Sequence, residues 1–149
     1  HAYCESIAEV QYAFFLEEVK LAEAIGVGIA KYPKKNFLSR TSILGPEYMG
    51  DDCIVPFDEQ WETGYRTGPF TIQDRYVTED VPVGCHLYHE LGKKFGVETP
   101  VIDSMITLGS VMTGKDFYKT GITLDDLGIE HLNKEQLLDY LNNNNYVEK

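Results

Sequence analysis

The chain has 149 residues, enough for one domain with a sizeable core, and its 43% hydrophobic and 25% charged residues are typical of a globular protein. Its formal net charge of −11 argues against a nucleic-acid-binding surface and against binding to an anionic membrane, since both need a basic face. No apolar run approaches the ~20 residues that a membrane span needs.

Residues Glu5 to Ile25 are predicted to form one long helix. Apolar side chains recur at helical spacing and make a stripe broad enough to pack on more than one side. The stripe comprises Ile7, Val10, Phe14, Phe15, Val19, Leu21, Ala22 and Ile25. Glu17 and Lys20 are expected to pair on the solvent-exposed face. Gly26 is expected to end the helix because glycine accepts the left-handed conformation needed there.

Residues 27–72 are harder to assign to regular elements because prolines and glycines break them into short pieces. The aromatic residues of this region, among them Trp61 and Tyr65, are too many for a disordered linker. We expect an ordered excursion of turns and short helices, one of them over Asn36 to Leu44. Long ordered loops of this kind are often binding surfaces.

Regular structure is expected to return after this irregular part. We expect Thr78 or Asp80 to cap a helix that carries Pro82 in its first turn and runs to Phe95, with Gly96 as its stop. Its inner face is lined at positions i, i+4 and i+8 by Leu87, Leu91 and Phe95.

A second helix is predicted to begin at Thr99-Pro100, with the threonine as N-cap and the proline in the first position, and to end at Gly114. Apolar residues fall on nearly all of its sides, so we expect it to be buried. Thr123 is predicted to cap a short turn over residues 124–127.

Asn133 is predicted to cap a last amphipathic helix that includes Leu137, Leu138 and Leu141. The sequence contains no internal repeat and no strand pair that the pattern supports. We therefore predict a mainly α fold, in a single helical domain over residues 1–149. The three cysteines are an odd number at wide spacings and form no disulfide framework, so we expect a reducing, cytoplasmic setting.

The centre of the chain, from Arg75 to Gly84, places a cation, two adjacent carboxylates and a proline within a few residues. A surface arginine and a helix-capping aspartate are the commoner explanation of such a pair. The functional alternative is that the Asp80 carboxylate, stabilised by the helix dipole, holds the Nδ1–H of a histidine and tunes it for acid–base work. Arg75 offers a planar fork that matches a substrate carboxylate. We take Asp80 as the candidate catalytic residue and Arg75 as the candidate substrate-binding residue, and interpret Glu79 as solvated or structural.

Cys85, His86 and His89 form a second group of candidate residues. Cys85 and His89 share a helix face, but no second cluster of cysteines and histidines supplies the further ligands that a metal needs. We therefore interpret all three as ordinary helix residues and predict no metal site. The sequence also has neither a GxGxxG nor a GxxxxGK[ST] loop, so any nucleotide that the protein uses is held elsewhere.

Several motifs follow one another in a specific order. They are Gly68-Pro69, Arg75-Tyr76, Glu79-Asp80-Val81-Pro82-x-Gly84 and Gly96-Val97-x-Thr99-Pro100-Val101-Ile102-Asp103. This order resembles the C-terminal helical domain of the octopine/nopaline (opine) dehydrogenase family. Residues 6–27 resemble the long first helix of that domain, and residues 121–128 resemble its closing Gly-x-Thr-Leu-x-x-Leu-Gly element. The likeness covers about residues 6–141.

The resemblance implies an all-α, multi-helical fold like the C-terminal domains of 6-phosphogluconate-dehydrogenase-like enzymes. It also implies an NAD(P)H-dependent condensation, in which an α-keto acid such as pyruvate and an amino acid form an imine that hydride reduces. In the family, an N-terminal Rossmann domain binds NAD or NADP, and a histidine acts as the acid–base group. The helical domain supplies an aspartate that partners this histidine and an arginine that contacts substrate carboxylate. These map onto Asp80 and Arg75.

The implied partners are the amino acid and the keto acid, the chain's own Rossmann domain, and a second copy in a homodimer. The Rossmann domain and its histidine are absent from this sequence, which opens on His1 without an initiator methionine, so we expect a fragment that is inactive alone. Ile122 stands where many relatives have a basic residue. Two alternatives stay open: the helical domain of another 6-phosphogluconate-dehydrogenase-like oxidoreductase that acts on a hydroxy acid, and a non-catalytic helical binding module.

Overall fold

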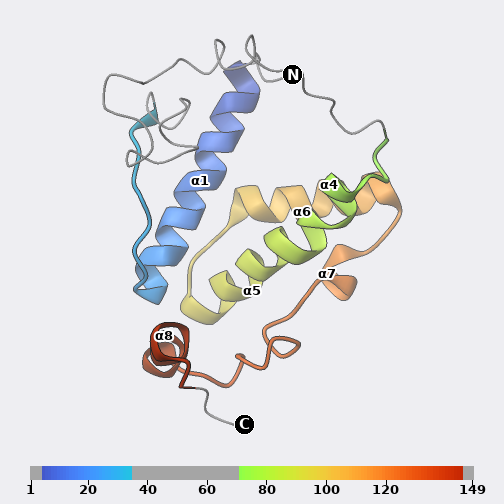
Figure 1. The fold of residues 1–149 in the computed structure, drawn as a ribbon. Coiled ribbons are helices and arrows are strands. Elements are labelled where there is room, and N and C mark those ends of the chain that lie inside the picture. The colour runs from blue at the N-terminus through green and yellow to red at the C-terminus, as the bar shows by residue number, and fades with distance from the viewer. Residues whose placement is uncertain (1–4, 35–70, 146–149) are drawn as a thin grey trace. The chain divides into compact units, whose positions relative to one another are not determined.

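The structure is a computed structural model that describes residues 5–34 and 71–145. Its elements are α1 (Glu5–Ile25), α4 (Arg75–Thr78), the π-helical turn η3 (Val81–Cys85), α5 (His86–Phe95), α6 (Pro100–Thr113), α7 (Phe117–Thr120) and α8 (Lys134–Asn143). This described part contains helices and no strand (Figure 1), which confirms the predicted all-α fold. The helix expected over Asn36 to Leu44 lies outside the described residues.

The chain divides into two compact units, and the boundary falls inside α1, between Leu16 and Glu17. One unit comprises residues 1–16 and 30–68, and the other comprises residues 17–29 and 69–149. In the first unit, the Phe15 side chain is buried, and its ring centroid lies 6.2 Å from that of Tyr32. The second unit contains the remaining helices and all the residues discussed below.

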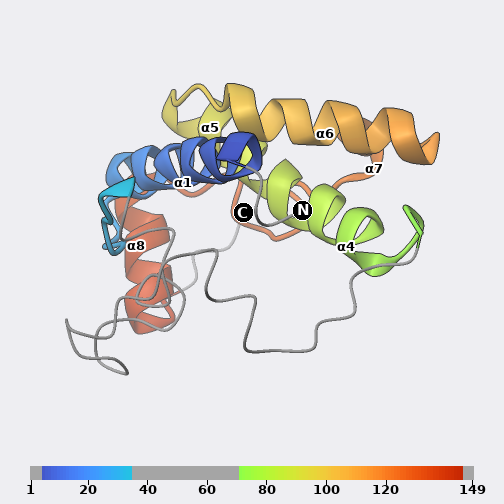
Figure 2. The same ribbon diagram turned by 90° about the horizontal axis from the view of Figure 1, so that it is seen from above.

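Within the second unit, α4, η3 and α5 follow one another and form one bent helical segment, with α6 packed beside it (Figures 1 and 2). Gly96 ends α5 in the left-handed conformation, with φ 70°, and its N–H donates to the carbonyl of Gly92. The chain then turns back into α6, so α5 and α6 lie against each other. This pair of helices carries most of the polar side chains of the candidate site.

A hydrophobic cluster joins the end of α1 to α8. Its buried members are Ile25, Leu132 and Leu137, and the partly buried residues around it include Leu91, Phe95, Ile129, Leu138 and Tyr140. Leu91 and Phe95 therefore do line the inner face of α5, as predicted. Asn133 begins α8 with a capping box, in which its side chain accepts from Gln136 N–H and Gln136 reaches back to the Asn133 N–H.

The helix α1 has the predicted bounds, and Gly26 follows it with φ 93°. The predicted pairing of Glu17 with Lys20 on the exposed face was wrong. The Glu17 side chain is 4% exposed, because it bonds to the start of α6 instead.

The prediction that α6 is buried on nearly every side was also wrong. Ile102 and Ile106 are fully buried, whereas Leu108, Val111 and Met112 are 54%, 76% and 52% exposed. The helix packs against η3, α5 and α7, so the apolar residues on its other face stay uncovered in this unit. None of the helices in residues 5–34 and 71–145 combines the length and apolar character needed to span a bilayer.

Candidate functional site

Arg75 opens the short helix α4 and forms an ion pair with Glu79 one turn later. Its Nε lies 3.1 Å from Oε2 of Glu79, and its Nη2 lies 3.3 Å from Oε1, so the two side chains meet as a fork. The Arg75 side chain is 75% exposed. A turn fixes the helix start ahead of it, because the Asp74 carboxylate accepts from both the N–H and the hydroxyl of Thr71.

Asp80 lies between α4 and η3, with its backbone in the helical region (φ −66°, ψ −33°) and its side chain exposed. Among the described residues, no group hydrogen bonds to its carboxylate, and no contact joins it to Arg75. The two candidate residues stand five positions apart, and in the described part of the chain neither a hydrogen bond nor an ion pair joins them.

The prediction that Thr78 or Asp80 caps a helix was wrong. The helical path already begins at Arg75, and backbone bonds from Glu79 N–H to Arg75 O and from Val83 N–H to Glu79 O carry it through this point. The chain is already helical where η3 begins after Asp80, so the Asp80 side chain makes no capping bond. The Thr78 hydroxyl donates back to the carbonyl of Asp74 at 3.3 Å.

Pro82 explains the π-helical turn that follows. Proline has no N–H and its ring disturbs the preceding turn, so the helix widens here instead of breaking. The His86 N–H then donates to the carbonyl of Val81, five residues back. The carbonyl of the buried Pro82 is released from the helix and accepts from Ile122 N–H at 2.9 Å. The turn thereby ties the segment after Asp80 to the chain after α7.

A partly buried polar cluster lies next to this turn. Burial, followed by the charges of Asp80 and Glu18, raises the pKa of the Cys85 thiol to about 11. Burial also raises the pKa of Tyr88 to about 12, with the Glu18 carboxylate as the next cause. Burial raises the pKa of Glu18 as well, while the hydrogen bond from Tyr88 acts in the opposite direction. Cys85 is therefore a protonated thiol at neutral pH and a poor nucleophile.

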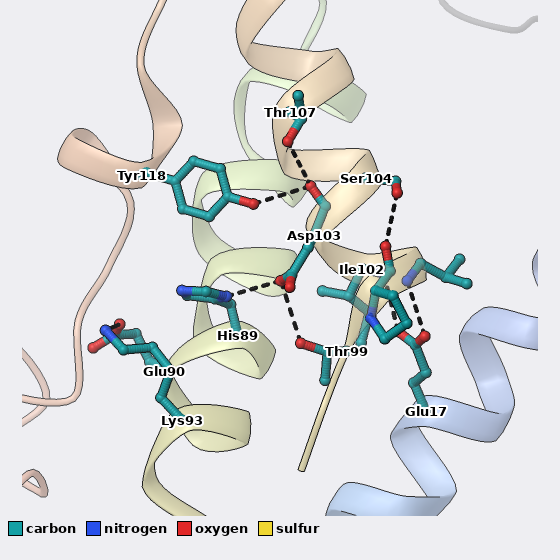
Figure 3. A network of polar contacts seen from close by, with 12 residues as sticks. Glu17, His89, Glu90, Lys93, Thr99, Ile102, Asp103, Ser104, Thr107 and Tyr118 are labelled. Atoms are coloured by element: carbon teal, nitrogen blue, oxygen red, sulfur yellow. Dashed lines mark hydrogen bonds and ion pairs between the residues drawn. The ribbon is translucent and has the colours of Figure 1, made fainter. Parts of the chain in front are cut away.

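His89 and Asp103 form a dyad that the sequence reading missed (Figure 3). The Nδ1–H of His89 donates to Oδ1 of Asp103 at 2.8 Å, and the Thr99 hydroxyl donates to the same oxygen at 3.3 Å. The Tyr118 hydroxyl donates to the Asp103 carbonyl at 3.1 Å. Both residues of the dyad line an open hollow of about 520 Å³ between the end of α5 and the start of α6.

The dyad links α5 to α6, whereas the sequence reading treated His89 as an ordinary helix residue. The only sequence signal for the dyad was the position of His89, three residues after His86 on an amphipathic helix. That spacing does not show that Asp103 accepts the hydrogen bond from His89. In the described ranges, no group of three or more metal-ligating side chains comes together.

The start of α6 is capped from outside the helix. Thr99 and Pro100 occupy the predicted N-cap and first positions, but the Thr99 side chain makes no capping bond. Glu17 of α1 takes that role, with Oε1 accepting from Val101 N–H at 2.9 Å and Oε2 from Ile102 N–H at 3.0 Å (Figure 3). A carboxylate at a helix N-terminus satisfies free amides and is favoured by the helix dipole.

Comparison with known proteins gives a consistent picture. Residues 1–113 match the family described as NAD/NADP octopine/nopaline dehydrogenase, alpha-helical domain. The chain is 33% identical over 141 residues to an opine dehydrogenase of Arthrobacter sp. strain 1C, an alignment that covers 88% of the chain and 39% of that protein. It is 32% identical over 89 residues to a vitopine synthase of Allorhizobium ampelinum, covering 59% of the chain and 25% of that protein.

The chain thus spans well under half the length of these two relatives. The family match covers most of the chain and includes the segment that carries Arg75 and Asp80. The sequence motifs, the all-α fold and the relatives agree, and the chain belongs to the octopine/nopaline dehydrogenase family, whose alpha-helical domain it contains.

Proposed function

We propose that this chain is the substrate-binding helical domain of an NAD(P)H-dependent opine dehydrogenase. The complete enzyme would condense the amino group of an amino acid with an α-keto acid such as pyruvate and reduce the resulting imine. Family membership and the similarity to an opine dehydrogenase support this reaction class. The observation that carries the proposal is Asp80, an exposed carboxylate without a hydrogen-bond partner in the described part of the chain, held directly ahead of an anchored turn.

The residues of this chain do not fit a dinucleotide site. Such a site places the pyrophosphate on a glycine-rich turn between a strand and a helix N-terminus. The sequence has no GxGxxG motif, residues 5–34 and 71–145 contain no strand, and Glu17 already binds two of the first amides of α6. We therefore assign NAD or NADP to a separate Rossmann domain of the complete enzyme, and the two organic substrates to the helical domain.

In this proposal, Asp80 accepts the Nδ1–H of a histidine that the rest of the enzyme supplies. An ionised carboxylate in that position fixes the tautomer of the imidazole and stabilises the imidazolium that forms when the histidine takes a proton. An exposed carboxylate with no competing partner is free to take up this bond. Its position at the bend between α4 and η3 makes it accessible to a domain packed against this surface.

Arg75 would bind a carboxylate of the amino acid or of the keto acid. Glu79 occupies the Nε–H and one direction of Nη2, and the remaining donors of the guanidinium stay available. The ion pair with Glu79 holds the long side chain in one orientation, so less conformational entropy is lost when a substrate carboxylate binds. Two parallel N–H···O bonds to the substrate are the expected geometry.

The substitution Asp80→Asn in the complete enzyme tests the catalytic role. We expect kcat to fall by about 10²- to 10⁴-fold, because an amide cannot stabilise an imidazolium as a carboxylate does. The matched control is Asp139→Asn, which removes an exposed carboxylate from α8 and should leave kcat unchanged. Activity would be followed by NADH or NADPH oxidation with pyruvate and a panel of amino acids. Unchanged turnover in Asp80→Asn would remove Asp80 from the mechanism.

The substitution Arg75→Lys tests the substrate-binding role. Lysine keeps the charge but loses the fork, so the KM of one carboxylate substrate should rise by about 10-fold while kcat changes less. Measuring KM for the keto acid and for the amino acid separately identifies which carboxylate Arg75 binds. Wild-type KM values for both substrates would refute the role.

A further inference from the structure

The π-helical turn after Asp80 is held in place by the chain that follows α7. Because the His86 N–H bonds to Val81, the Pro82 carbonyl is free to accept from Ile122 N–H at 2.9 Å. Pro82 stands two residues after Asp80 in the chain. Any movement of residues 121–122 is therefore passed to the turn on which Asp80 stands.

The His86 side chain makes the second half of this attachment. It is 2% exposed, and its Nδ1–H donates to the Ile122 carbonyl at 2.8 Å. The bond fixes the tautomer, because a carbonyl can only accept and Nδ1 must therefore carry the proton. Ile122 is thus held by both of its backbone groups, one bonded to the carbonyl of Pro82 and the other to the side chain of His86.

The residues packed around the His86 imidazole hold the ring in one orientation. A Cβ added at Gly121 would lie 2.4 Å from Cγ of His86 and 2.7 Å from its Nδ1, so only glycine lets the ring approach the chain here. The His86 ring also lies edge-on to Tyr118, with ring centroids 6.2 Å apart. The ring cannot move without displacing residues that are themselves packed.

We infer that His86 is a positioning residue for Asp80: by clamping Ile122 against the π-helical turn, it fixes the backbone from which the Asp80 side chain projects. This inference rests on the proposed role of Asp80. His86 itself is buried and does not touch substrate. Its effect would therefore appear in kcat, through the placement of the carboxylate against the acid–base histidine.

The test uses three substitutions in the complete enzyme. His86→Asn keeps a donor at the same distance from Cα as Nδ1, His86→Gln places its donor one atom further out, and His86→Leu has no donor. We expect kcat to fall by about 10- to 100-fold in the Leu and Gln variants, and Asn to recover most of the loss. The KM for the substrate that Arg75 binds should change less, because Glu79 orients Arg75 independently of the turn.

Two parallel variants separate positioning from loss of stability. Asn133→Ala is the control, since it removes the capping box of α8 and leaves His86 and its bond to Ile122 intact. We expect it to lower the thermal midpoint of unfolding without the loss of kcat. The pH profile of kcat/KM should shift in His86→Leu in the same direction as in Asp80→Asn, because both variants deprive the acid–base histidine of its carboxylate.

The outcomes are distinct. Wild-type turnover in Asp80→Asn would overturn the proposed role of Asp80 and the positioning role of His86 together. A large loss in Asp80→Asn with normal kcat in a folded His86→Leu would overturn the positioning role alone. If His86→Leu does not fold, the comparison of His86→Asn with His86→Gln tests the positioning role. Equal kcat values for these two variants would refute it, because they would show that the placement of the donor does not matter.

Discussion

Removing the Glu17 carboxylate should destabilise the domain as strongly as removing a core side chain. Glu17 is 4% exposed and accepts from two backbone amides at the start of α6, at 2.9 and 3.0 Å. Glu17→Ala leaves the buried Ile102 amide and the partly buried Val101 amide without an acceptor, and each unpaired amide costs about 1–3 kcal/mol. With the favourable interaction between the carboxylate and the helix dipole also lost, we expect a total of about 3–5 kcal/mol. Glu17→Gln keeps one acceptor and should cost about half as much.

The assay is urea denaturation followed by far-UV circular dichroism, with thermal unfolding as a second measurement. For a protein of this size, the expected loss in Glu17→Ala corresponds to a fall of about 10 °C in the midpoint of unfolding. Lys20→Gln is the matched control: it lies on the exposed side of the same helix and should change the free energy of unfolding by less than about 0.5 kcal/mol. A loss below about 1 kcal/mol in Glu17→Ala would refute the cross-helix cap.

Three further predictions concern single residues. The raised pKa of Cys85, about 11, should slow its alkylation by iodoacetamide at about pH 8 roughly 100-fold relative to the urea-unfolded chain. Asp80→Asn should speed this reaction, because the Asp80 charge contributes to the raised pKa. Peptide mass spectrometry gives both rates. Asn133→Ala should cost about 1 kcal/mol in urea denaturation through loss of the capping box, and a neutral result would contradict it. Burial raises the pKa of Glu18 above its unfolded value, so its contribution to stability is present below the unfolded pKa and lost as the pH rises through the folded one. Glu18→Gln should therefore stabilise the domain at about pH 8 but not in acid, and an equal effect at both pH values would refute this.

The sequence predicted the elements whose signals are local. The apolar stripe of α1 and Gly26 together marked both ends of that helix, and the capping residue Asn133 marked the start of α8. Leu91 and Phe95 were recognised as core residues because helical periodicity reports which face is apolar. The family motifs directed attention to the segment around Asp80 for a different reason, since they reflect likeness to known proteins.

What the sequence did not reveal depends on contacts between distant residues. Glu17 looks like a surface residue because the backbone amides that donate to it lie in α6, far along the chain. His89 looks ordinary because its partner Asp103 is reached only after the turn at Gly96. The π-helical turn was missed because Pro82 is compatible with a helix start, and only the bond from Ile122 shows where its carbonyl points. Periodicity also cannot tell an apolar face that is covered from one that is not, as α6 illustrates.

The cap that Glu17 provides has a consequence for how the domain folds. The residues it joins are separated by 84 and 85 positions along the chain, so the contact closes a very long loop. The first turn of α6 can therefore gain full protection of its amides only after α1 has docked. Hydrogen exchange at Val101 and Ile102 would report that docking event directly, and a shortened chain that begins after α1 would leave the two amides exchanging freely.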